Sequence, residues 1–242
     1  MMFWHLARRD LLAAFTTPLA WLVIACWTLI TNGVFVFLSL QPVHAEGLGS
    51  DLPLYVTTLT IGIYLLTLLA PALTMNSFAA EQGQGTMQLL LTVPVREVDL
   101  VLGKFTAAFV LLATLIATTA GQVVVLAIVS AVQLPHLIAG YLGILLVSAF
   151  FAALGVWISL LVDAPVAAYV ITFAVIAVLL LIGAGPEGSF LHSINARIGL
   201  IERARHFFSG QIRSGDTAYF LAASAGLLVC AHAALKARRL HG

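Results

Sequence analysis

Charged side chains are scarce in this chain. Of its 242 residues, 11 are Lys or Arg and 10 are Asp or Glu, so only 9% are charged. A soluble globular domain carries about 25% charged residues, because its surface must be hydrated. Hydrophobic residues make up 62% of the chain, and the mean hydropathy is +1.08. This composition excludes a soluble globule and predicts an integral membrane protein.

Clustered basic residues and cysteine pairs are also lacking. The formal net charge is only +1, and binding to nucleic-acid phosphates needs clusters of Lys and Arg. The sequence therefore predicts no nucleic-acid partner. The two cysteines, Cys26 and Cys230, both lie within apolar runs. This placement is typical of small buried residues and disfavours a disulfide framework or a cysteine metal site.

Catalytic motifs are absent as well. The chain has no His-Glu-x-x-His zinc motif and no Gly-x-Ser-x-Gly nucleophile motif. It has no phosphate-binding Gly-x-x-x-x-Gly-Lys-Ser/Thr loop, because Gly103-Lys104 is followed by Phe105. Inside the predicted spans the only histidine or charged side chain is His232, whereas an intramembrane enzyme would need such groups. We expect no catalytic residues and no cofactor in this chain.

Seven histidines are scattered along the sequence. Four of them, His44, His136, His192 and His206, fall on one predicted side of the membrane and could together bind a metal or haem. Histidines in such positions are more often ordinary polar residues at the membrane surface. The prediction is that the chain holds no metal.

Long segments without charge define the predicted spans. These segments run over residues 11–45, 52–80, 105–162, 164–186 and 217–235. A helix needs about 20 residues to cross the hydrocarbon core, and the third segment has room for two crossings. The sequence thus predicts an all-α membrane protein, a single domain over 1–242, with six transmembrane helices near 19–40, 53–76, 104–132, 138–161, 166–184 and 217–235.

The basic residues predict the orientation. An even number of spans places both termini on one side, which then carries seven Lys and Arg residues, whereas four arginines lie on the other side. The positive-inside rule makes the first side cytoplasmic. Residues Met1 to Thr17 form a predicted amphipathic helix on this face that ends at Pro18. A signal peptide is not expected, because the apolar core of a signal peptide spans only about 7–15 residues, far fewer than the first segment without charge at 11–45.

The segment before the last span is amphipathic. Its apolar residues Phe190, Leu191, Ile194, Ile198, Ile201 and Phe208 recur at helical spacing, with charged residues between them. Such a segment can lie in the membrane interface. The pattern over residues 187–213 fits both an interfacial and a re-entrant segment.

The loop between the second and third spans is the most distinctive stretch. Glu81 follows the second span, and Gly83 and Gly85 form a predicted bend. A short apolar helix from Thr86 to Thr92 follows, with Thr86 as its N-cap and its end set by Pro94. Its leucines, Leu89 and Leu90, could bind a cytoplasmic partner or rest on lipid headgroups.

This loop resembles that of ABC-2 type transporter permeases, with matches at Glu81, Gly85, Thr86, Leu89, Leu90, Pro94, Gly103 and Lys104. The closing segment, from Phe208 to Phe220, is similar to that of the smaller members linked to gliding motility and nitrous-oxide-reductase maturation. Six spans, cytoplasmic termini and a basic N-terminal amphipathic helix also resemble that family.

The resemblance implies that this chain is the permease subunit of an exporter in a bacterial cytoplasmic membrane. Such a subunit pairs with a second copy or a paralogue, and with separate P-loop subunits that bind ATP and Mg²⁺. The segment from Gly85 to Pro94 would dock on the ATPase. Glu81 would pair with Arg8 or Arg9, or else be solvated. The alternatives are a haem-exporter-type permease for cytochrome maturation and a membrane assembly scaffold that transports nothing.

Overall fold

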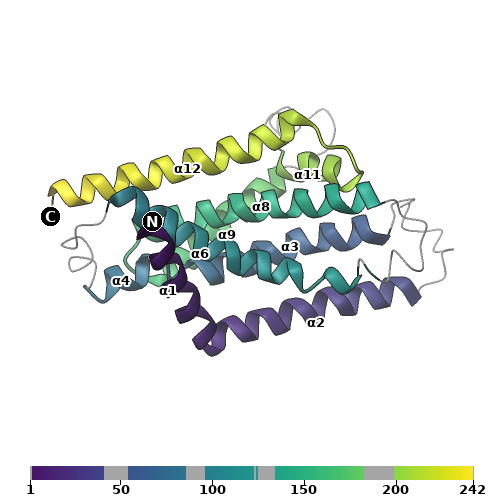
Figure 1. The fold of residues 1–242 in the computed structure, drawn as a ribbon, viewed down its shortest axis with the longest axis horizontal. Helices are drawn as coiled ribbons and strands as arrows, with labels where there is room; N and C mark the ends of the chain where they lie inside the picture. Colours follow the sequence, from purple (N-terminus) through teal and green to yellow (C-terminus); the bar gives the residue numbers. More distant parts are fainter. Residues whose placement is uncertain are drawn as a thin grey trace.

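The computed structural model describes residues 2–40, 54–85, 96–122, 124, 134–182 and 199–241. Within these ranges every regular element is an α-helix (Figure 1). The helices are α1 (Met2–Thr16), α2 (Pro18–Leu40), α3 (Leu54–Thr74), α4 (Ala79–Gly83), α6 (Glu97–Ala117), α8 (Leu134–Leu161), α9 (Pro165–Ile182), α11 (Leu200–Phe208) and α12 (Ser214–His241).

Five of these helices are long and apolar enough to cross a membrane, namely α2, α3, α6, α8 and α12. The predicted span at 166–184 corresponds to α9, which is shorter. With 18 residues, α9 is about 27 Å long, close to the ~30 Å of the hydrocarbon core. The prediction of an all-α membrane protein is confirmed.

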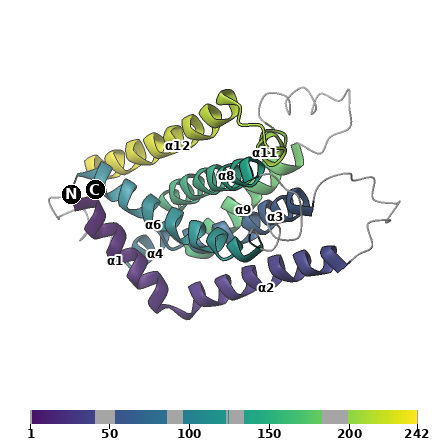
Figure 2. The same cartoon turned by 45° about the vertical axis from the view of Figure 1, so that its right-hand side comes forward.

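Helix α8 forms the centre of the bundle. In its most apolar stretch 72% of the residues are buried, against 22% in α2 and in α12. It contacts α3, α6, α9, α11 and α12, and Figures 1 and 2 show it enclosed by these helices. The reason is its small side chains: Gly155 lets α3 approach so closely that a Cβ there would lie 2.1 Å from Thr74 Oγ1.

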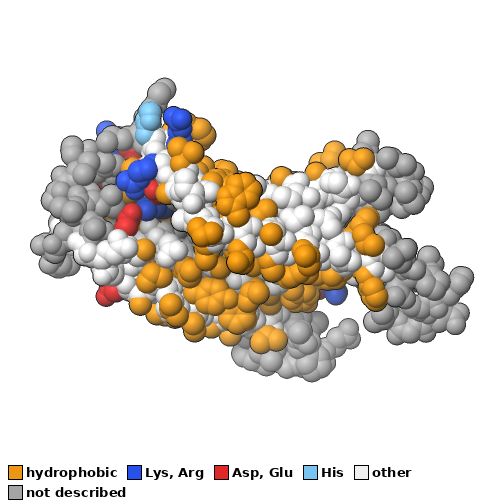
Figure 3. All heavy atoms as spheres, turned by 90° about the horizontal axis from the view of Figure 1, so that it is seen from below, with side chains coloured by type: hydrophobic (Ala, Val, Ile, Leu, Met, Phe, Trp, Pro, Cys, Tyr) orange, Lys and Arg blue, Asp and Glu red, His pale blue; other side chains and the backbone are white. Residues whose placement is uncertain are grey.

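Charged side chains lie toward the ends of the bundle rather than in its middle. The N- and C-termini lie at the same end of the molecule, as predicted for an even number of spans (Figures 1 and 2). In the view of Figure 3, charged side chains gather near that end, whereas the middle of the surface is largely apolar. Because burying a charge in lipid is costly, this distribution marks the middle as the membrane-facing band.

Helix α1 ends at Thr16, and the chain turns directly into α2 at Pro18, in agreement with the predicted N-terminal helix. The turn is closed by the Thr17 hydroxyl, which donates to Ala14 O at 2.6 Å, and by Trp21 Nε1, which donates to Phe15 O at 2.8 Å. Proline has no N–H group, but at the first position of α2 this costs no hydrogen bond, because an N–H there has no partner within the helix.

The amphipathic segment before the last span packs on protein. Helix α11 buries Leu200, Ala204, Phe207 and Phe208, and its Phe207 lies against Gly143 of α8. The apolar face of residues 200–208 therefore packs on α8. Residues 183–198 lie outside the described ranges.

Ion pairs fasten α11 to the start of α12. The buried Asp216 carboxylate accepts from Arg203 Nη1 at 2.8 Å, and its other oxygen lies 2.9 Å from His206 Nδ1. Arg203 also lies over the Tyr219 ring, 4.4 Å from its centroid. Asp216 thus provides a partner for Arg203 and His206, which the sequence places outside the predicted spans.

Replacing Gly155 by alanine should destabilise the bundle, because the new Cβ would overlap Thr74. Overpacking of this kind costs about 1–3 kcal/mol, which lowers the melting temperature by about 2–4 °C for each kcal/mol in a chain of this size. The measurement is thermal unfolding in a mild detergent. Gly226→Ala is the control, since a Cβ at Gly226 meets nothing within 4 Å. An equal melting temperature for both variants would contradict the close contact.

Candidate functional site

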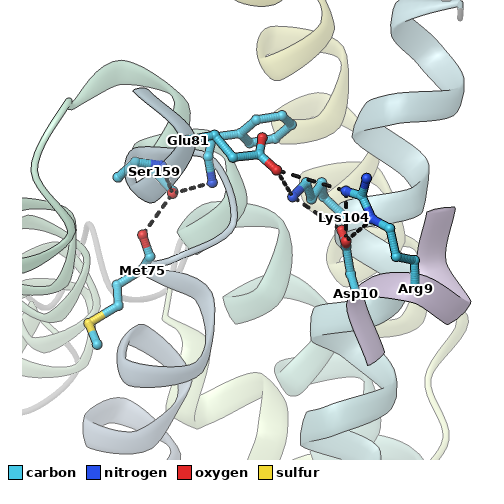
Figure 4. A network of polar contacts seen from close by, with 8 residues as sticks. Arg9, Asp10, Met75, Glu81, Lys104 and Ser159 are labelled. Carbon is cyan, nitrogen blue, oxygen red and sulfur yellow. Dashed lines mark hydrogen bonds and ion pairs between the residues drawn. The ribbon is translucent and has the colours of Figure 1, made fainter. Parts of the chain in front are cut away.

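The turn between α3 and α4 is bound to the C-terminal end of α8 by one hydroxyl group. Ser159 Oγ accepts hydrogen bonds from the backbone N–H groups of Phe78, at 2.9 Å, and Ala79, at 3.0 Å. It donates to the Met75 carbonyl at 3.0 Å (Figure 4). Ser159 thereby satisfies three backbone groups of a buried turn, and unpaired groups there would be costly.

Helix α4 also packs closely against the chain that follows α8. The Gln82 side chain donates to the Leu160 carbonyl at 2.8 Å. A Cβ on Gly83 would lie 2.7 Å from the Asp163 carbonyl oxygen. At this position a glycine is needed for the close approach of two backbones. The whole segment from Met75 to Gly83 is therefore held along α8 and the start of α9.

On the other side of α4, a buried lysine joins three helices. Lys104 of α6 has a side chain only 7% exposed. Its ammonium group donates to Glu81 Oε1 of α4 at 2.7 Å and lies 3.1 Å from Asp10 Oδ2 of α1. Arg9 Nη2 lies 3.0 Å from Asp10 Oδ1 and 3.9 Å from Glu81 Oε1 (Figure 4). These four residues are called the Lys104 cluster below.

The Lys104 cluster is neutral overall, with two cationic and two anionic side chains. Desolvation of an ammonium group is repaid only when opposite charges and hydrogen bonds surround it. Phe78 adds a further contact, since its ring centroid lies 5.7 Å from Lys104 Nζ. Phe78 belongs to the turn that Ser159 binds, so the two networks act on the same turn.

Close packing of α1 on α6 brings Asp10 to Lys104. A Cβ on Gly103 would lie 3.2 Å from Leu6 Cβ and 3.3 Å from the Phe3 carbonyl oxygen. The glycine of the Gly103-Lys104 pair thus gives α1 room beside α6. This is the physical reason for a glycine before the lysine in the sequence.

Two boundaries differ from the sequence prediction. The third span was predicted to begin at 104, at the membrane surface, but α6 begins at Glu97, so Lys104 lies inside the helix. Two features of the sequence indicate this start of the helix. Pro94 precedes it, and Glu97 and Asp99 stand in its first turn, where negative charges interact favourably with the helix dipole. The last helix is also longer than predicted, because α12 continues to His241.

Of the residues predicted to couple to a partner, Glu81 and Gly85 are described. Glu81 lies in the Lys104 cluster, and Gly85 has a φ of 70°, a conformation that glycine adopts readily. Of the two predicted partners of Glu81, Arg9 lies 3.9 Å from Glu81 Oε1, farther away than Lys104. The other, Arg8, is exposed. Thr86, Leu89, Leu90 and Pro94 lie outside the described residues.

Three residues of the site were given no role by the sequence reasoning: Asp10, Lys104 and Ser159. Lys104 was noted only as part of a motif. Its partners come from helices far away in the sequence, so no local pattern could identify them. A lysine preceded by glycine and followed by a long apolar run was the one available signal, since an unpaired charge there would be expensive.

The histidines do not form a described metal site. Among the residues that the structure describes, no group of three His, Cys, Asp or Glu side chains is placed to hold a metal ion. His206 faces Asp216, and His136 lies against Gly210, where a Cβ would be 2.3 Å from His136 Cδ2. His44 and His192 lie outside the described ranges.

Removing the ammonium group of Lys104 should destabilise the protein. In Lys104→Met the carboxylates of Asp10 and Glu81 lose their shared cation. Breaking a buried pair costs about 3–5 kcal/mol, and the partial exposure of both carboxylates places the expected loss at the lower end. The measurement is unfolding in detergent at low and high salt.

Arg239→Met is the matched control, because Arg239 pairs with Glu97 at the same end of the molecule and both are more exposed. It should have a much smaller effect. Adding Glu81→Gln to Lys104→Met should recover part of the loss, since it removes one of the opposing charges. Equal stability of Lys104→Met and Arg239→Met would rule out the energetic role of the cluster.

Comparison with known proteins gives the family. A search of curated proteins finds no match. The family model described as "ABC-2 family transporter protein" matches residues 10–194. This match includes Asp10, Glu81, Lys104 and Ser159, and it covers more than half of the chain. The chain therefore belongs to the ABC-2 family of transporter proteins and is a multi-pass membrane subunit of an ABC transporter.

Proposed function

We propose that this chain is an exporter permease whose α3–α4 turn transmits the action of a separate ATPase subunit to the membrane helices. One observation carries the proposal. The turn is bound by Ser159 on one side and by the Lys104 cluster on the other, and it leads directly into the segment that resembles a coupling helix. A displacement of that segment would act on α8, α6 and α1 together.

Gly85 lies between α4 and the predicted docking segment. Its φ of 70° is in the left-handed region, which other residues adopt only at a cost of about 1–2 kcal/mol. Residues 86–94 then carry the predicted docking positions Thr86, Leu89, Leu90 and Pro94. ATP can drive transport only if it stabilises two arrangements of this region to different extents.

The partner subunit supplies the chemistry. This chain has no phosphate-binding loop, so the proposal places ATP and Mg²⁺ on a P-loop partner. The orientation follows the basic residues, with both termini in the cytoplasm of a bacterium. The family resemblance favours export.

A second permease subunit, identical or paralogous, completes the proposed transporter. The translocation path would lie between the two, lined by α2, α3 and α9. Helix α2 offers an apolar surface for this contact or for lipid: Leu29 is 74% exposed and Phe37 is 63% exposed. With no charge in the middle of these helices, an amphiphilic or hydrophobic cargo is the best match.

The first test is a mild-detergent pull-down of the tagged chain, expressed with its native gene neighbours and analysed by mass spectrometry. The proposal requires a P-loop ATPase at near one-to-one ratio. A clean preparation without ATPase, from cells that express one, would favour the scaffold alternative.

Leu89→Asp with Leu90→Asp should disrupt binding to the ATPase. A hydrophobic contact at the centre of an interface is worth about 2 kcal/mol or more, so co-purified ATPase should fall roughly thirtyfold while membrane insertion is unchanged. Ile212→Asp, an exposed position at the opposite end of the bundle, is the control. Unchanged co-purification of the double variant would refute docking through these leucines.

Glu81→Ala should impair coupling more than assembly, because it removes one carboxylate of the Lys104 cluster and no docking residue. Coupling residues contribute about 0.5–2 kcal/mol, and we expect permease-stimulated ATP turnover in reconstituted vesicles to fall roughly 2- to 30-fold. Glu97→Ala, which removes an acid paired with Arg239, serves as the control. Wild-type turnover in Glu81→Ala would show that the cluster takes no part in coupling.

A further inference from the structure

A cavity lies beside the Lys104 cluster, between α1, the start of α2, the end of α3 and α6. Its volume is about 270 Å³, slightly below the ~300–1,000 Å³ of typical small-molecule sites. The walls are largely apolar and consist mostly of small side chains. They include Ala13, Ala14, Ala20, Ala72, Ala107 and Ala108.

One end of this cavity is charged. Asp10 and Lys104 are the only charged residues in its lining, and they carry opposite signs. Asn76, Ser77 and Thr17 add uncharged polar groups. An occupant must therefore combine an apolar part, which contacts the alanines, with a polar part that faces a carboxylate and an ammonium group together.

The position of the cavity selects the kind of occupant. It lies at the junction of α1 and α2, beside the Lys104 cluster. In the view of Figure 3, charged side chains gather near the end of the molecule where the termini lie, and an apolar band follows them. Lipid headgroups meet the hydrocarbon region at this level. The cavity is too small for a whole phospholipid, but it can accept part of one acyl chain.

We infer that this cavity binds a zwitterionic phospholipid of the inner leaflet, with an acyl chain between the alanines and its headgroup at Asp10 and Lys104. The phosphate oxygens would accept from Lys104, and the ammonium group would donate to Asp10. A purely anionic headgroup would face the Asp10 carboxylate, and a purely cationic one would face Lys104. Charge complementarity thus favours a headgroup with both signs.

Such a lipid would contact the residues that bind α1 to α6 and α4. It would stabilise the position of α1 from the membrane side, and the coupling region would respond to lipid composition. Binding itself requires only that the chain lies in a membrane. The inference can therefore be tested without the ATPase, and it stands or fails separately from the proposed function.

The test measures lipid retained by the purified chain. The protein in maltoside detergent is delipidated, mixed with equal amounts of phosphatidylethanolamine and phosphatidylglycerol, and examined by native mass spectrometry. The wild type should retain phosphatidylethanolamine about tenfold better than phosphatidylglycerol, because like charges placed together weaken binding strongly.

Filling the cavity should remove this lipid. Ala14→Leu and Ala72→Leu each add volume inside it, and retention should fall about tenfold, as expected when a new side chain overlaps the occupant. Ala117→Leu is the matched control, because Ala117 is exposed on α6 away from the cavity. Equal retention by all three variants would overturn the site.

A second variant tests the headgroup. Asp10→Asn leaves the cavity with a single positive charge, so its preference should shift toward phosphatidylglycerol without loss of the chain-binding part. An unchanged preference would overturn the role of the charge pair. If Ala14→Leu instead alters the oligomeric state, measured by light scattering, with lipid retention unchanged, the occupant is a second copy of the chain and the lipid inference is wrong.

Discussion

The Lys104 ammonium group can remain inside the bundle only because two carboxylates from other helices surround it. Burying one charge without partners would cost several kcal/mol. This requirement determines where α1 and α4 lie, since Asp10 and Glu81 must both reach the same nitrogen. The ion pair adds to the close packing of α1 on α6 at Gly103 and sets the position of Asp10 along α6. The neutral sum of the cluster makes this arrangement tolerable at the edge of the hydrocarbon core.

The end of the molecule that carries both termini is held together for a related reason. Ser159 binds the turn between α3 and α4 through backbone groups, and Phe78 of that turn lies beside Lys104. Side chains in such close contact do not deform gradually but change between distinct arrangements. The proposed coupling to a separate ATPase subunit needs an element of this kind, because force from that subunit would have to reach several membrane helices at once.

Hydropathy predicted the helices well and their contacts poorly. Segments without charge marked the spans, because the cost of placing a charge in lipid dominates all local preferences. Pro18 correctly separated the N-terminal helix from α2. The same reasoning placed Lys104 at the membrane surface, because a charged residue is taken as the end of a span unless its partners are known. Those partners, and the Ser159 hydrogen bonds, join distant parts of the sequence. Likewise, the apolar face of α11 was identified, but nothing local distinguishes a face that meets lipid from one that meets α8.

Two of the close glycine contacts of α8 restrict the number of residues between them as well as the residue types. Gly143 faces Phe207 of α11, and Gly155 faces Thr74 of α3. Twelve residues separate these glycines, about 18 Å along the axis, so each contact sits at a fixed height and a fixed angle relative to the other. Inserting or deleting one residue between them would rotate one contact by about 100° relative to the other. A substitution elsewhere in α8 leaves both glycines in place, whereas an insertion or deletion between them loses one of the two contacts.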